Sequence, residues 1–132
     1  MVVLCSISDL GKYKRSNRDV TFAIVRYMDS AIDGIQQFSR LAPSADLFAF
    51  TQANKDTEGF WSLYHAMYQK ELVSNEKQVG LALVEDLVRT GVEVNLVCYC
   101  KDSTKCHRED VYHALLNLSL IHISEPTRHA QI

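Results

Sequence analysis

Long hydrophobic runs are missing from this chain of 132 residues, which has no stretch of about 18 consecutive apolar residues. A membrane-spanning helix is therefore not expected. A secretory signal is not expected either, because the basic residues of the first segment, MVVLCSISDLGKYKRSNRD, follow its apolar stretch instead of preceding it. We expect the mature chain to start here and to stay in the cytoplasm, or in the host cytoplasm if the protein is viral.

The sequence also lacks the short motifs of the common enzyme classes. It has no G-x-G-x-x-G, no G-x-x-x-x-G-K-[ST], no H-E-x-x-H and no G-x-S-x-G. These absences argue against the usual nucleotide-binding, protease and hydrolase sites. The net charge of −2 gives the whole chain no general attraction for nucleic acid, so any cationic function must come from local clustering.

The composition is that of one ordinary globular domain, with 47% hydrophobic and 23% charged residues. No internal repeat or low-complexity linker divides it. The cysteines are Cys5, Cys98, Cys100 and Cys106. In a reducing compartment we expect them to be free, catalytic or metal-binding rather than bridged.

The hydrophobic pattern predicts an α/β fold. Buried strands are predicted at the apolar runs 2–7, 20–28 and 92–100. Helices are predicted at the amphipathic segments 56–73 and 76–91. A third helix is predicted at 108–118, where acidic residues in the first turn suit the helix dipole. Strands that alternate with helices in this way indicate a mainly parallel sheet.

Three finer expectations concern the helices. The predicted buried stripes are Phe60, Leu63, Tyr64, Met67 and Tyr68 in one helix, and Val79, Leu83, Leu87 and Val88 in the next. Gly91 is predicted to end the second of these helices. The ambiguous segment 29–50 is interpreted as a helical piece over 30–38, a break at Pro43 and a short strand or turn over 46–50.

The last stretch differs from the rest. SLIHISEPTR, residues 119–128, resembles translated sequencing-adapter read-through. We therefore expect an α/β domain over 1–118, an artefactual tail over 119–132, and a phage or metagenomic origin. The alternative is a genuine amphipathic tail.

The segment VCYCKDSTKCHRED, residues 97–110, concentrates the reactive side chains. A zinc site would use Cys98, Cys100, Cys106 and His107, but two cysteines on one face of a strand lie about 6–7 Å apart, and we predict no metal ligands. A phosphatase loop needs five residues between cysteine and arginine, whereas seven separate Cys100 from Arg108.

Two other interpretations of this segment remain open. Cys106 lies near a predicted helix start beside His107 and Arg108, which favours a thiolate. The same turn is typical of an anion cradle, since free N–H groups at a helix start attract anions and Arg108 adds a bidentate fork.

Topology favours the anion cradle. In open parallel sheets ligands bind beyond the carboxyl ends of the strands, which are predicted near Ile7, Tyr27 and Cys100. The basic residues expected at this edge are Lys12, Lys14, Arg15, Arg18, Arg26, Lys101, Lys105 and Arg108. Such clustering recruits anionic ligands. We interpret His65 and His113 as surface or satisfied core histidines, and Tyr64 and Tyr68 as core.

Four segments resemble the family called domain of unknown function 488. LVCYCKDSTKCHRE matches its strand–loop–helix signature, in which a Cys-His-Arg triplet opens the last helix. AIVRYM, FSRLAPSADL and FWSLYHAMYQKEL are similar to its arginine-bearing strand, its Leu-Ala-Pro-Ser segment and its aromatic helix. The resemblance covers residues 1–118. Many members carry an acidic residue at the position of Cys100, and an aspartate at that of Ile24.

The resemblance implies a Rossmann-like or flavodoxin-like fold and a site formed by Arg26, Cys98, Cys100, Cys106, His107 and Arg108. Together with the charge placement it predicts a small protein that binds an anionic, nucleotide-like ligand and requires no known cofactor. The predicted ligand-binding residues are Tyr13, Arg26, Tyr27, Cys100, Lys101, Cys106, His107 and Arg108. Cys106 and His107 are also the predicted catalytic residues.

Three alternative functions remain open. They are a phage anti-defence protein that sequesters a nucleotide immune signal, an enzyme that uses a thiol or histidine on a nucleotide-type substrate, and a zinc-stabilised interaction domain. A homodimer is a further expectation, since exposed edges of small α/β domains often pair.

Overall fold

The computed structural model describes residues 2–12, 18–28, 31–100, 102–117 and 123–124. Its strands are β1 Val2–Ser6, β2 Asp19–Ala23, β3 Gln36–Gln37, β4 Glu93–Cys98 and β5 Ile123–Ser124. Its α-helices are α1 Ala45–Asn54, α2 Phe60–Glu71, α3 Asn75–Arg89 and α4 Arg108–Leu116. Short 3-10 helices are η1 Ile7–Lys12, η2 Ser39–Leu41 and η3 Ser103–Lys105.

The strands form one sheet in the order β3-β2-β4-β1-β5, and every pairing is parallel. All positions of β1 are buried, as are the last five of β4, because neighbouring elements cover both faces of these central strands. This confirms the predicted α/β class with a parallel sheet, and the layout agrees with a Rossmann-like or flavodoxin-like fold. None of the described helices is long and apolar enough to cross a membrane.

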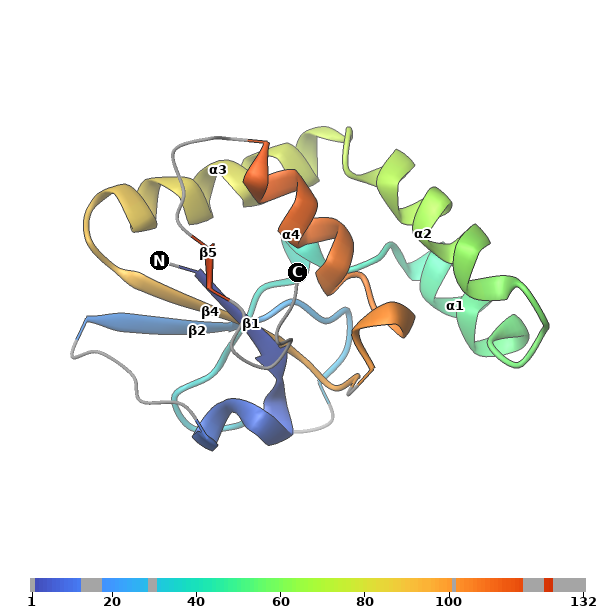
Figure 1. The fold of residues 1–132 in the computed structure, drawn as a ribbon, viewed down its shortest axis with the longest axis horizontal. Helices are drawn as coiled ribbons and strands as arrows, with labels where there is room; N and C mark the ends of the chain where they lie inside the picture. The colour runs from blue at the N-terminus through green and yellow to red at the C-terminus, as the bar shows by residue number, and fades with distance from the viewer. Residues whose placement is uncertain (1, 13–17, 29–30, 101, 118–122, 125–132) are drawn as a thin grey trace.

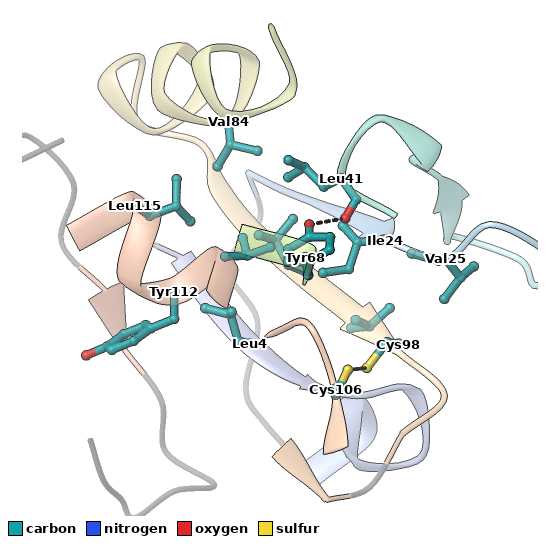
Figure 2. Packing of buried hydrophobic residues seen from close by; sticks show 14 of the residues in the cluster. Leu4, Ile24, Val25, Leu41, Tyr68, Val84, Cys98, Cys106, Tyr112 and Leu115 are labelled. Carbon is teal, nitrogen blue, oxygen red and sulfur yellow. Dashed lines mark hydrogen bonds between the residues drawn. The ribbon is translucent and has the colours of Figure 1, made fainter. Parts of the chain in front are cut away.

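The helices fall into two groups (Figure 1). α3 and α4 pack against the sheet and each other, whereas α1 and α2 pair beyond its edge. The hydrophobic core between the sheet and the helices contains Leu4, Tyr68, Val84 and Leu115 (Figure 2). The hydroxyl of Tyr68 donates a 2.5 Å hydrogen bond to the Leu41 carbonyl.

Segment 29–50 departs from the sequence prediction. The described residues of 30–38 hold a bridge between Ile32 and Ile35 followed by β3, not a helix. The predicted strand or turn over 46–50 is also wrong, because α1 occupies it. Ser44 makes this helix possible: its hydroxyl accepts from the Leu47 N–H at 3.1 Å and caps the first turn. Pro43 thus lies just before the N-cap of α1, instead of separating a helical piece from a strand or turn.

The end of β2 and the buried face of α3 also differ from the prediction. β2 ends at Ala23. The Ile24 N–H still donates to the Val97 carbonyl of β4 at 2.9 Å, but residues 24–28 do not continue the predicted strand. The inward face of α3 is rotated, since Val79 and Leu83 are exposed while Leu81 and Val84 are buried. Gly80 lies on the buried face, where a Cβ would be 3.1 Å from Leu41 side-chain atoms, so a larger residue there would require Leu41 to shift by a few tenths of an ångström.

Turns and caps fix the remaining helix ends. Gly91 adopts φ +88° directly after α3, which confirms it as the predicted end of that helix. Gly59 adopts φ +77° at the start of α2. The Glu71 carboxylate at the end of α2 accepts hydrogen bonds from the Ser44 N–H at 2.8 Å and from the Ser44 hydroxyl at 2.5 Å. These bonds hold the start of α1 against the end of α2.

Candidate functional site

The carboxyl ends of the three central strands meet at one edge of the sheet. Ser6 of β1 is paired with Cys98 of β4, and Ala23 of β2 with Val97. The chain segments that leave these strands therefore start side by side, as the topology predicts. Arg18 does not belong to this edge, contrary to expectation: it directly precedes β2 and donates to the Thr90 carbonyl at 3.2 Å, at the amino ends of the strands.

A pocket of about 560 Å³ opens at this edge. Its walls come from the segments after β2 and β4, from η3 and from helices α1 and α2. The aromatic lining residues are Tyr27, Phe48, Trp61, Tyr64 and Tyr99. The cationic ones are Arg26, Lys55 and Lys105, opposed by the single carboxylate of Asp102 among the described lining residues.

Sequence reasoning missed the contribution of α1. Phe48 and Lys55 line the pocket from this helix and the residue that follows it, whereas the prediction placed a strand or turn there. The signal that could have found α1 is the Ser-Ala-Asp-Leu run, in which a serine cap and an early acidic residue mark a helix start. The Tyr27 ring meets Phe48 edge-on at 5.0 Å, which joins the strand end to the helix.

Arg26 is held in the pocket wall by its backbone and its side chain. Its Nε donates to the Pro43 carbonyl at 3.0 Å, and its own carbonyl accepts from the Gln37 side chain at 2.9 Å. Because a guanidinium carries five N–H groups, the bond to Pro43 leaves up to four for a ligand. Arg26 is thus a fixed cation at the position predicted for an anion clamp.

Three thiols converge at the pocket wall. The Sγ atoms of Cys98, Cys100 and Cys106 all lie within 4.8 Å of one another. Cys98 and Cys106 are 3.0 Å apart and buried (Figure 2), whereas Cys100 is exposed. The predicted separation of Cys98 and Cys100 assumed a strand that continues to residue 100. β4 instead ends at Cys98 and the chain bends at Tyr99.

The environments of the three thiols differ. Burial raises the pKa of Cys106 to about 12. The neighbouring thiols, together with burial, raise the pKa of Cys98 well above its usual value. The thiols of Cys106 and Cys98 lower the pKa of Cys100, and the Arg108 charge adds to this effect. The most acidic thiol of the cluster is therefore the exposed one.

His107 is buried and neutral at pH 7. Its Nε2 lies 2.5 Å from the Ile24 carbonyl, which can only accept, so the proton is on Nε2. Nδ1 is then the unprotonated nitrogen, 3.7 Å from the Cys106 Sγ. Burial lowers the pKa of His107 to about 4. The catalytic roles predicted for Cys106 and His107 stay predictions.

Arg108 is 6% exposed and does not line the pocket. Burial alone would lower the pKa of its guanidinium, but the thiols of Cys98 and Cys106 outweigh this effect and raise the pKa. The side chain thus carries its charge next to the thiol cluster. Of the predicted ligand-binding residues, the pocket lining contains Arg26, Tyr27, Cys100 and His107. Cys106 and Arg108 are buried and are not part of the lining. Tyr13 and Lys101 fall outside the described residues.

A polar network fastens α4 and η3 to α2. His65 Nδ1 lies 2.6 Å from the Asp110 carboxylate, and Nε2 lies 2.7 Å from the Thr104 carbonyl. Gln69 donates to the same carboxylate at 3.0 Å. Asp110 raises the pKa of His65; burial opposes this shift and the Thr104 carbonyl adds to it. The interpretation of His65 as a satisfied histidine fits these contacts, while His113 is mostly exposed.

The family comparison agrees with the resemblance noted in the sequence. A family model described as the Active DUF488-N3 subclade (DUF488-N3a) matches residues 6–119, and the chain belongs to this family. No curated protein and no solved structure matches the chain.

Proposed function

We propose that the protein binds a small anionic, nucleotide-like ligand in the pocket at the carboxyl ends of β2 and β4. The observation that carries the proposal is the lining of this pocket, where three cations stand among five aromatic side chains. Its volume of about 560 Å³ is within the range that holds a small organic ligand.

The cations favour a ligand with a phosphate or carboxylate group. Among the described lining residues the cations are Arg26, Lys55 and Lys105, and the one carboxylate is that of Asp102. Asp102 already accepts from the Thr104 N–H at 3.0 Å and from the Thr104 hydroxyl at 2.6 Å. Its charge is thus partly engaged, whereas a positively lined cleft attracts anions from solution.

The aromatic residues favour a ligand with a planar ring. Trp61 meets Tyr64 edge-on at 5.1 Å, and both line the pocket from α2. Tyr27 and Tyr99 are exposed at the strand ends on other parts of the wall. Burial raises the pKa of Tyr64, so its hydroxyl stays protonated. A nucleobase offers the flat face that such side chains stack on, at about 1–3 kcal/mol per base.

Calorimetric titration tests the proposal with a panel of nucleoside mono-, di- and triphosphates, the unphosphorylated nucleosides and inorganic phosphate. We expect at least one nucleoside phosphate to bind more tightly than its nucleoside or phosphate alone. Arg26→Gln should weaken this binding by about tenfold or more, because a bidentate charge-assisted contact is lost.

A second variant guards against an effect of Arg26→Gln on the fold. Lys55→Ala combined with Lys105→Ala removes two exposed cations of the wall and should also weaken binding. Lys70→Ala, on the same helix as Trp61 but outside the lining, should bind like the wild type. The proposal fails if no compound of the panel binds saturably, or if the wall variants bind as well as Lys70→Ala.

A further inference from the structure

We infer that Cys98, Cys100 and Cys106 form a binding site for a thiophilic divalent cation of the Zn²⁺ type, with one coordination position open to the pocket. The inference goes beyond the proposed function and stands independently of it. It rests on the convergence of three sulfur atoms within 4.8 Å of one another.

The geometry of the cluster is close to what the ion requires. Zinc binds thiolate sulfur at about 2.3 Å, so two sulfurs of a tetrahedral site lie about 3.8 Å apart. The Cys98 and Cys106 sulfurs are 3.0 Å apart, and the widest pair in the cluster is within 4.8 Å. Small side-chain rotations would bring all three to the same distance from one ion. Thiolate is also the ligand that selects soft and borderline metals.

The three ligands come from rigidly placed parts of the fold. Cys98 is the last residue of the central strand, and Cys106 directly precedes the helical turn at the start of α4. Both are almost fully buried. Cys100 lies two residues beyond the strand, after the bend, and its sulfur returns toward the other two. A site assembled in this way needs little ordering of the chain when the ion binds.

The fourth position faces the pocket. His107 is not counted as a ligand in this arrangement, because the convergent group of described residues contains the three cysteines alone. Cys98 and Cys100 both line the pocket, so water or a ligand atom can reach the ion from that side. Three protein ligands plus one open position is the arrangement of zinc sites that act on a substrate, whereas purely structural sites are closed.

Arg108 balances the charge of such a site. Three thiolates around a divalent ion carry one net negative charge, and burying that charge is costly unless a cation is near. The Arg108 guanidinium is buried and interacts with all three thiols. The Cys-His-Arg triplet thus supplies one ligand, Cys106, and one countercharge, Arg108, from adjacent positions at the start of α4.

The test measures Zn²⁺ binding to the reduced full-length chain by competition with a chromophoric chelator, and Cd²⁺ binding by its sulfur-to-metal charge-transfer absorption. We expect one ion per chain. Cys100→Ser is the main variant because this thiol is exposed and its loss should leave the core intact. It should lower Zn²⁺ affinity by more than about 100-fold, since even outer-shell changes cost 10–100-fold.

Cys5→Ala is the matched control. Cys5 is a buried thiol of β1 that lies outside the convergent group. We expect this variant to bind Zn²⁺ like the wild type. The inference is overturned if the reduced wild type binds no Zn²⁺, or if Cys100→Ser binds as tightly as Cys5→Ala. No nucleotide is present in these measurements, so their failure is distinguishable from a failure of the proposed function.

Discussion

The two ends of the same parallel sheet are built differently. At the amino ends, the Glu93 N–H donates to the Arg18 carbonyl at 2.8 Å, and the Arg18 side chain donates to the Thr90 carbonyl at 3.2 Å. Gly91 turns the chain tightly from α3 into β4. Backbone bonds and the Arg18 side chain thus connect the segments at this end. At the carboxyl ends the chain segments diverge, and side chains from two helices complete a pocket between them.

The difference shows what an open strand end requires. The carboxyl end of β4 places two thiols and a tyrosine, Cys98, Cys100 and Tyr99, on the pocket wall. Polar contacts from other elements hold that wall in place, among them the His107–Ile24 and His65–Asp110 bonds. At the amino end, β4 enters directly from the turn at Gly91. We expect the two ends to respond differently to mutation.

The largest expected contrast is between His107→Ala and Arg18→Ala. His107→Ala removes a buried ring packed on Tyr68 and leaves the Ile24 carbonyl without its donor. It should lower the free energy of unfolding by about 3 kcal/mol. Arg18→Ala removes an exposed contact at the amino end and should change it by no more than about 0.5 kcal/mol.

Urea denaturation followed by circular dichroism measures both values. Equal losses of stability in the two variants would contradict the claim that side-chain contacts matter more at the carboxyl ends of the strands than at the amino ends.

A smaller effect with a distinct pH dependence is expected at His65. Its pKa is raised in the folded protein by Asp110, and Glu109 adds to the shift. A raised folded pKa means that the stabilisation is complete below the unfolded pKa of about 6.5 and is lost as the pH rises through the folded value. His65→Gln should therefore cost roughly 1 kcal/mol at pH 6 and less at pH 9.

Denaturation of the wild type and His65→Gln at the two pH values measures this difference. His113→Gln, an exposed histidine on α4, serves as the control and should show little change. A cost for His65→Gln that is the same at both pH values, or larger at pH 9, would show that the ion pair with Asp110 does not support the wall.

Much of the fold follows from sequence pattern alone. The runs around Val2–Ser6 and Glu93–Cys98 are mostly apolar and contain several valines, so they predict buried parallel strands, and the structure has them. The α2 helix is predicted within a few residues, because its aromatic residues recur at helical spacing. These features depend on local chemistry and on one hydrophobic face, which the sequence displays directly.

What the pattern missed depends on contacts between distant segments. The hydrophobic pattern of α1 is weak. Its serine cap is a local signal, but Glu71 of α2, which also holds the start of the helix, is distant in sequence. On the buried face of α3, Leu41 packs closely against Gly80. Such contacts are visible only once the chain is folded.

The three thiols are recognisable in the sequence as candidate zinc ligands, but their convergence is not predictable from it, for a related reason. Sequence spacing separates Cys98 from Cys106 by seven residues and gives no sign that their sulfurs lie 3.0 Å apart. The bend after Cys98, which brings Cys100 back toward both, is likewise not encoded by a glycine or proline. The Cys-His-Arg motif indicates the location of the site but not which of its side chains face the pocket.

Fluorescence of Trp61 tests the central claim most directly. This residue is the one tryptophan of the chain, and it lines the pocket, so its emission reports what enters there. We predict a saturable change in emission when a nucleoside phosphate is added to the wild type or to Arg18→Ala, and its loss in Arg26→Gln. An emission spectrum that stays constant across the nucleotide panel, or that changes equally in Arg26→Gln, would contradict a ligand pocket at the carboxyl ends of the strands.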